Sequence, residues 1–344
     1  MTTEGIDKNL QTPEAQQPPL AEAVFKSETI EILTGNSNPQ LARDVGDLLA
    51  MGVDEPVGVF ADGESRVQIS KNLRRKEVFI IQSTSRPVNH SVMELILMIR
   101  AARRASADEV NAIIPYYGYA RQDRKDQPRV TISGADVADI LDTAGVDRIL
   151  TIDLHAEQIQ GVLDKPWDNL YASRVLLPAI QEFGTDNMIV VSPDVGGTKR
   201  AEKFSFLLNG TGEIAIVHKR RAEANKSQAL AVIGDVEGRD VLLVDDIIDT
   251  AGTMCNAAKL LKDNGAQRII IAATHGLFTS PALDRITDSS IDKVFVTDTV
   301  YLSDEVRRSE KVKVVTIAPL LADALKRIHT GDSLSALISK PTGK

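Results

Sequence analysis

An apolar run that ends in two adjacent acidic residues is the segment of this sequence best suited to chemistry. Residues 241–253 read VLLVDDIIDTAGT, and VLLV is typical of a strand buried on both faces of a sheet. Asp245 and Asp246 follow it, and a short loop over residues 249–253 then opens a helix. Ligands bind at the carboxyl ends of strands in open α/β sheets, and helix N-termini present backbone N–H groups to phosphates. The segment therefore predicts a phosphate site, with hydroxyl donors from Thr250 and Thr253 and carboxylates that face sugar hydroxyls or a phosphate-bound metal. The alternative is an ordinary strand-to-helix turn in which Asp and Thr are caps.

Five further segments place polar side chains on predicted loops or strand ends. They are FADGE (60–64), PYYGYARQDR (115–124), TIDLHAEQIQG (151–161), SPDVGGTKRA (192–201) and HKRRAEANKS (218–227). Taken singly, four of the five have a structural explanation: Phe60 as a core residue, His155 as a satisfied polar residue, Asp194 as a helix cap, and residues 219–221 as a solvated charge cluster.

Short β-rich runs alternate with amphipathic helical stretches along most of the chain. The predicted strands are 30–33, 57–60, 78–81, 112–115, 148–152, 188–191, 214–217, 241–244, 269–272, 294–296 and 312–317; the clearest helices begin at Pro39 and span 90–104 and 253–264. Such alternation predicts mainly parallel α/β sheets, because parallel neighbours need crossover connections. A strand–loop–helix–strand pattern over residues 78–118 recurs over 241–276, which suggests two related halves.

Length and composition limit the function classes. The chain has 344 residues, a net charge of -8 and one cysteine. The length suggests about two domains, the acidic balance disfavours a general nucleic-acid binder, and a single cysteine excludes a disulfide framework or a multi-cysteine zinc site. We find no apolar run of membrane-spanning length and no secretory signal, so we expect a cytoplasmic protein that binds neither nucleic acid nor membrane.

Together, these segments resemble the ribose-phosphate pyrophosphokinases (PRPP synthases, bacterial class I) from about residue 30 to about residue 338. Residues 241–253 resemble the PRPP motif, which type I phosphoribosyltransferases share, and the other five segments favour the synthases. The resemblance implies two similar type I phosphoribosyltransferase-like domains. We expect a mobile tail over 1–24, an ATP-side domain over 25–168 and a ribose 5-phosphate-side domain over 169–344, with the last helices packing back on the N-terminal domain.

The resemblance also implies a set of site residues. Lys219 and Arg221 would be catalytic. ATP would contact Phe60, Asp62, Gly63, Glu64, Arg121 and Gln122. Ribose 5-phosphate would contact Arg221, Asp245, Asp246, Asp249, Thr250, Ala251, Gly252 and Thr253. His155 and Asp194 would bind Mg²⁺. Three features depart from the family pattern: Ala251 stands where a glycine is common, Glu223 stands where a cation is common, and residues 125–129 are less basic than the usual continuation of RQDR.

The implied reaction moves the β,γ-diphosphoryl group of ATP to the C1 hydroxyl of ribose 5-phosphate. Its products are PRPP and AMP, and PRPP supplies nucleotide, histidine and tryptophan biosynthesis. The resemblance further implies a homohexamer with phosphate and ADP as effectors. Three alternatives are a phosphoribosyltransferase, a non-catalytic regulatory homologue and a general sugar-phosphate binder. Formation of AMP from ATP and ribose 5-phosphate would separate the synthase from all three.

Overall fold

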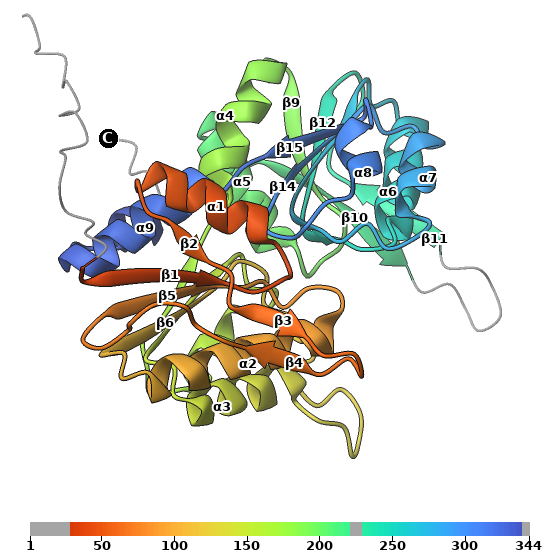
Figure 1. The fold of residues 1–344 in the computed structure, drawn as a ribbon. Coiled ribbons are helices and arrows are strands. Elements are labelled where there is room, and N and C mark those ends of the chain that lie inside the picture. Colours follow the sequence, from red (N-terminus) through yellow and green to blue (C-terminus); the bar gives the residue numbers. More distant parts are fainter. Residues whose placement is uncertain (1–27, 221–228, 339–344) are drawn as a thin grey trace, which may run out of the picture.

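Two mainly parallel sheets organise the chain in the computed structural model, which describes residues 28–220 and 229–338 (Figure 1). The first sheet has the strand order β2 (Val53–Asp54), β1 (Ile30–Thr34), β5 (Glu77–Ile81), β6 (Glu109–Ile114), β7 (Arg148–Ile152), β8 (Trp167–Leu170). The second has the order β11 (Ala229–Ile233), β10 (Ile214–Arg220), β9 (Met188–Ser192), β12 (Asp240–Ile248), β13 (Ile269–Gly276), β14 (Lys293–Thr297), β15 (Val312–Val315). Neighbours run parallel throughout both described sheets except at β10–β11.

The two sheets share one topology. With β11 set aside, and with strands numbered in chain order within each sheet, both have the order 2-1-3-4-5-6. Each half also has an antiparallel element after the second strand of its sheet. In the first half it is the hairpin of β3 (Val57–Val59) and β4 (Ser65–Val67), which follows β2, and in the second half it is β11, which follows β10 and pairs with it. The prediction of two similar α/β halves is confirmed.

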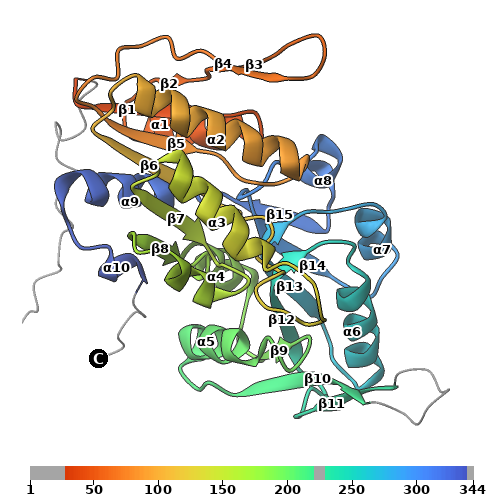
Figure 2. The same cartoon turned by 90° about the horizontal axis from the view of Figure 1, so that it is seen from below.

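Helices cover the sheets on both faces (Figure 2). They are α1 (Pro39–Leu48), α2 (Val88–Arg104), α3 (Ser133–Ala144), α4 (Ser173–Phe183), α5 (Thr198–Asn209), α6 (Gly252–Asp263), α7 (Ala282–Thr287), α8 (Asp304–Arg308), α9 (Ala318–Thr330) and α10 (Ser335–Ile338), with a 3₁₀ turn η1 (Glu157–Val162). Helices α2 and α3 pack on one face of the first sheet, and α6 and α7 pack on one face of the second.

A continuous apolar core joins the two sheets. It contains Phe79 and Leu150 from the first sheet, Leu242 and Ile270 from the second, and Leu321 from α9, all at most 2% exposed. Full burial of each such side chain stabilises the fold by about 1.5–3 kcal/mol. Helices α1, α4 and α9 contribute to the same core, so the sheets are held at a fixed relative position.

The end of the described chain returns to the first sheet. His329 Nδ1 lies 2.7 Å from Glu77 Oε2 on β5, and Arg174 Nε donates to the Leu337 carbonyl at 2.8 Å. Strand β8 runs through the predicted boundary at residues 168 and 169, and Trp167 contacts the Tyr117 ring edge-on with centroids 5.2 Å apart. The tail predicted over residues 1–24 lies outside the described residues.

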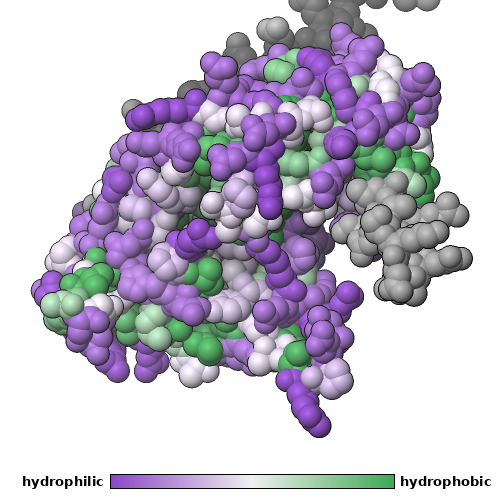
Figure 3. Space-filling view, turned by 90° about the vertical axis from the view of Figure 1, so that its right-hand side faces the viewer, coloured by the Kyte–Doolittle hydropathy of each residue, from purple (hydrophilic) through white to green (hydrophobic). Residues whose placement is uncertain are grey.

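Hydrophilic side chains dominate the face in Figure 3, where hydrophobic ones form small separate patches. Over residues 28–220 and 229–338, no helix combines the length and hydropathy needed to cross a membrane.

Candidate functional site

The carboxyl ends of β7 and β12, from different sheets, meet in one site. Strand β12 extends beyond the predicted residues 241–244 and pairs with β13 as far as Ile248, so Asp245 and Asp246 lie inside the strand and not after it. His155 follows β7, and its Nδ1 lies 2.7 Å from Asp246 Oδ2. The two halves of the chain therefore share one site.

Arg200 on α5 binds both acidic side chains of β12. Its Nη1 lies 3.3 Å from Asp245 Oδ1 and 3.1 Å from Asp246 Oδ1. The Asp246 side chain is 3% exposed, whereas that of Asp245 is 28% exposed. The two carboxylates thus have different environments despite being adjacent.

These environments separate the acidities of the pair. Burial and the neighbouring Asp246 charge raise the pKa of Asp245. Burial opposes ionisation of Asp246 too, but the hydrogen bond with His155 and the charge of Arg200 outweigh it and lower the pKa of Asp246. The same hydrogen bond raises the pKa of His155. At neutral pH, Asp246 is therefore ionised and binds both His155 and Arg200.

The loop over residues 249–253 leads directly into α6. Ala251 adopts φ 59° and ψ 2°, the left-handed conformation that alanine resists at a cost of about 1–2 kcal/mol. Arg285 Nη1 donates to the Thr250 carbonyl at 2.9 Å and fixes the loop from outside. Gly252 and Thr253 are the first helical residues, so their N–H groups have no intrahelical partner and can bind a phosphate.

Arg121 reaches this loop from the segment after β6. Its Nη1 donates to Asp249 Oδ2 at 2.9 Å. Burial opposes ionisation of Asp249, but hydrogen bonds from Thr279 and Arg121 outweigh it and lower its pKa. Gln122 points elsewhere, because its Oε1 accepts a 2.5 Å hydrogen bond from Ser133 Oγ at the start of α3.

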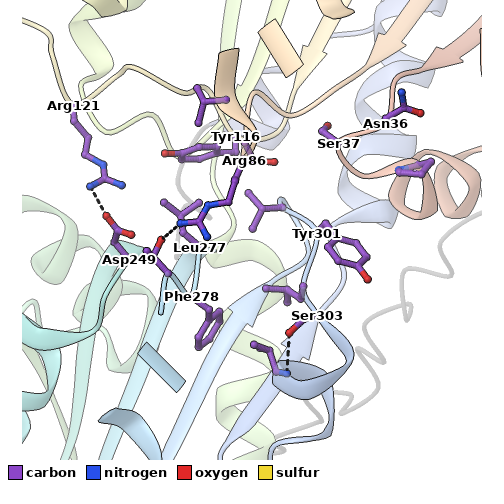
Figure 4. A pocket seen from close by; sticks show the side chains of 17 residues that line it. Asn36, Ser37, Arg86, Tyr116, Arg121, Asp249, Leu277, Phe278, Tyr301 and Ser303 are labelled. Atoms are coloured by element: carbon purple, nitrogen blue, oxygen red, sulfur yellow. Dashed lines mark hydrogen bonds and ion pairs between the residues drawn. The ribbon is translucent and has the colours of Figure 1, made fainter. Parts of the chain in front are cut away.

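A cavity of about 750 Å³ opens beside the Arg121–Asp249 pair (Figure 4). Loops of the first sheet line it with Asn36, Ser37 and Arg86, and loops of the second line it with Phe278, Thr279, Tyr301 and Ser303. Its volume lies within the range of small-molecule sites.

Several predicted site residues lie apart from the acidic group. Phe60, Asp62, Gly63 and Glu64 form the exposed turn between β3 and β4, where Phe60 is 52% exposed and Arg66 lies 5.9 Å from its ring centroid. Phe60 is therefore not a core residue, and none of the four lines the cavity. The backbone of Lys219 belongs to β10, its side chain lies outside the described part, and Arg221 is outside the described residues.

Asp194 is exposed on the loop after β9 and is not a helix cap, because the N-cap of α5 is Gly197 and no side chain caps that helix. One carboxylate oxygen accepts from the Gly197 N–H at 2.9 Å, ahead of α5. Across the described residues, no three His, Cys, Asp or Glu side chains form a metal-binding group. The exposed Asp194 carboxylate suits Mg²⁺, which prefers oxygen ligands, takes few of them from the protein and completes its shell with water and substrate phosphates; the His155 imidazole is not a ligand of the kind that Mg²⁺ prefers.

Sequence analysis missed three residues at this site: Arg86, Arg200 and Thr279. Arg200 belongs to the quoted segment 192–201 without being singled out, whereas Arg86 and Thr279 shortly follow the ends of strands β5 and β13. Their signal would have been position after a buried strand, since polar side chains there reach the ligand edge of a sheet.

His275 is buried between the two sheets. It is 2% exposed, its Nδ1 lies 2.9 Å from Thr299 Oγ1, and its Nε2 lies 3.3 Å from the Asp153 carbonyl. Burial lowers the pKa of His275, whereas the unfolded chain keeps an ordinary value of about 6.5. Below that pH the unfolded state therefore binds more protons than the folded state.

We predict that His275 makes the fold acid-sensitive. The free energy of unfolding should fall as the pH drops below about 6.5, by up to about 1.4 kcal/mol per pH unit from this residue. Urea unfolding of the wild type and His275→Asn between pH 5 and 8 measures this. The difference between them should change as the pH drops below 6.5 and stay constant above 7; a difference independent of pH throughout would contradict the prediction.

Comparison with known proteins gives a matching family model in each half of the chain. Residues 30–145 match the N-terminal domain of ribose phosphate pyrophosphokinase, and residues 217–339 match the phosphoribosyl synthetase-associated domain. The ribose-phosphate pyrophosphokinase of Pasteurella multocida is 49% identical over 313 residues, which cover 90% of this chain and 99% of the relative. The chain belongs to the ribose-phosphate pyrophosphokinase family.

Two further proteins, a curated relative and a solved structure, support the assignment to the ribose-phosphate pyrophosphokinase family. The relative from Shewanella oneidensis is 50% identical over 312 residues, with 90% of this chain and 99% of the relative covered. The crystal structure of phosphoribosylpyrophosphate synthetase from Mycobacterium smegmatis matches with a TM-score of 0.83 and 39% identity, over 88% of this chain and 99% of that one. The resemblance and the fold class drawn from the sequence are both confirmed.

Proposed function

We propose that this protein transfers the β,γ-diphosphoryl group of ATP to the C1 hydroxyl of D-ribose 5-phosphate and forms PRPP and AMP. The observation that carries the proposal is the meeting of His155 with the acidic group and phosphate loop of β12 in a chain of this family. The anomeric oxygen attacks the β-phosphorus, the bond to the α-phosphate oxygen breaks, AMP leaves, and the hydroxyl proton passes to solvent.

The ribose 5-phosphate side is assigned to β12 and its loop. Backbone N–H groups and hydroxyls of residues 249–253 hold the 5-phosphate, where a helix N-terminus favours negative charge. Asp245 and Asp246 accept hydrogen bonds from the ribose hydroxyls. Arg200 and His155 keep the Asp246 carboxylate ionised and in place.

The ATP side and the catalytic cations are assigned to loops. Phe60, with Asp62, Gly63 and Glu64, takes the adenosine, and Arg121 with Gln122 binds the nucleotide. Lys219 and Arg221 stabilise negative charge that builds up on the transferred group, which aimed cations do well in a water-poor site. Since the 60–64 turn does not line the cavity, we assign its nucleotide contacts to an assembled oligomer.

Mg²⁺ is the proposed cofactor, with His155 and Asp194 as its protein ligands. When bound, it would neutralise phosphate charge on the substrates. We further propose the division into domains at residues 25–168 and 169–344, a cytoplasmic homohexamer, and regulation by phosphate and ADP.

Incubation with ATP, Mg²⁺ and ribose 5-phosphate tests the function. We expect equimolar AMP and PRPP, detected by anion-exchange chromatography. A phosphoribosyltransferase would instead consume added PRPP when a nucleobase is present, and a regulatory homologue or a sugar-phosphate binder would leave ATP intact. Either result would contradict the proposal.

A further inference from the structure

Two arginines from loops of the first sheet contact residues that follow strands of the second sheet. Arg121 binds Asp249 directly, at 2.9 Å. Arg86 binds Thr279, with 2.9 Å from its Nη2 to Thr279 Oγ1, and Figure 4 shows both arginines on the same side of the cavity. Arg86 is a residue to which the proposed function assigns no role.

Hydrogen-bond chemistry fixes the direction of the second contact. A guanidinium has donors and no acceptor, so the Thr279 hydroxyl accepts from Arg86. The Thr279 hydroxyl keeps its one hydrogen for another acceptor, and the ionised carboxylate of Asp249, which lines the same cavity, can only accept. A hydrogen bond from Thr279 and the positive charge of Arg86 both lower the pKa of Asp249.

Hydrogen bonds of neighbouring residues hold both ends of the Arg86–Thr279 contact. Arg86 follows four buried polar residues, 82–85, in which Thr84 Oγ1 donates to the Tyr116 carbonyl at 3.1 Å and Ser83 Oγ donates to the Thr299 carbonyl. Thr279 follows Leu277, whose N–H donates to the Ile248 carbonyl of β12 at 2.8 Å. The backbone next to Thr279 is therefore hydrogen-bonded to Ile248, the residue that precedes Asp249. Arg86, from a loop of the other sheet, donates to the Thr279 hydroxyl.

We propose that Arg86 is a positioning residue, which orients the Thr279 hydroxyl toward Asp249 and so fixes the start of the loop that takes the 5-phosphate. This inference rests on the proposed function of that loop. Arg86 acts through Thr279 and needs no contact with a substrate. Its loss therefore weakens ribose 5-phosphate binding more than ATP binding.

A double-mutant cycle between Arg86 and Thr279 tests the inference. Arg86→Ala should raise KM for ribose 5-phosphate by about 3–10-fold, the effect of losing one hydrogen bond of typical net strength, and change KM for ATP by less than about twofold. Thr279→Val should give a similar increase, and the double variant should be no worse than Thr279→Val alone. Arg86→Lys should restore part of the affinity, because it keeps the charge and a donor.

Arg104→Ala is the matched control, because Arg104 is exposed at the far end of α2 and should leave both KM values unchanged. Additive effects of the two substitutions would overturn the inference, as would an equal rise of KM for ATP. If the wild type forms no AMP, the proposed function fails, and calorimetric titration of the same variants with ribose 5-phosphate decides about Arg86. Equal affinity of wild type and Arg86→Ala would then overturn the inference.

Discussion

Lys219→Ala is expected to lower kcat by about 10²–10³ while the fold stays intact. The backbone of Lys219 pairs with Leu230 of β11, one residue before the end of β10, and the proposed reaction assigns its ammonium to the transferred group. A donor aimed at developing charge contributes mainly in the transition state, so kcat should fall more than KM rises. Steady-state AMP formation measures both.

A second lysine controls for the loss of charge. Lys313 is exposed on β15, the edge strand of the same sheet, and Lys313→Ala should keep wild-type turnover. Thermal unfolding should give the same midpoint for all three proteins. Near-normal turnover of Lys219→Ala would remove Lys219 from the proposed machinery.

Asp246→Asn should have the second large effect, on both activity and stability. The substitution leaves Arg200 and His155 without their ionised partner, which we expect to lower the free energy of unfolding by about 1–3 kcal/mol. It also removes a carboxylate proposed to bind ribose, so kcat/KM for ribose 5-phosphate should fall by about 10²-fold or more.

Asp245→Asn is the matched comparison, one residue away. Because burial and the Asp246 charge raise the pKa of Asp245, an uncharged amide there should cost the free fold little. The difference in stability between the two variants should depend on pH, because folding lowers the pKa of Asp246. The difference should be present above about 3.9, the pKa of an aspartate in the unfolded chain, and be lost as the pH falls through the pKa of Asp246 in the folded protein. Equal destabilisation by both substitutions at pH 7, measured in urea, would contradict this account.

Local pattern was enough to predict the sheet architecture. Runs such as VLLV at 241–244 are apolar enough to be read as buried parallel strands, and the repeated rhythm pointed to two similar halves. Strands β2, β4, β8 and β11 were not predicted. They are two to five residues long, and β8 and β11 owe their place to tertiary pairing that no local pattern encodes.

The site was predicted in its parts but not in its contacts. The acids of β12 and the loop over 249–253 stood out in the sequence, whereas the His155–Asp246 contact joins positions 91 residues apart. Arg86 and Thr279 are 193 residues apart, and each follows a strand of a different sheet. Such pairs depend on how the two sheets face each other, which depends on the shared core and not on any single segment.

The most direct test of the central claim is ³¹P NMR of the wild-type protein with ATP, Mg²⁺ and ribose 5-phosphate. The account predicts that the ATP signals are replaced by those of AMP and of an intact diphosphoryl group on C1 of the ribose, in equal amounts. Accumulation of ADP with a singly phosphorylated C1, or ATP that stays unchanged, would contradict it.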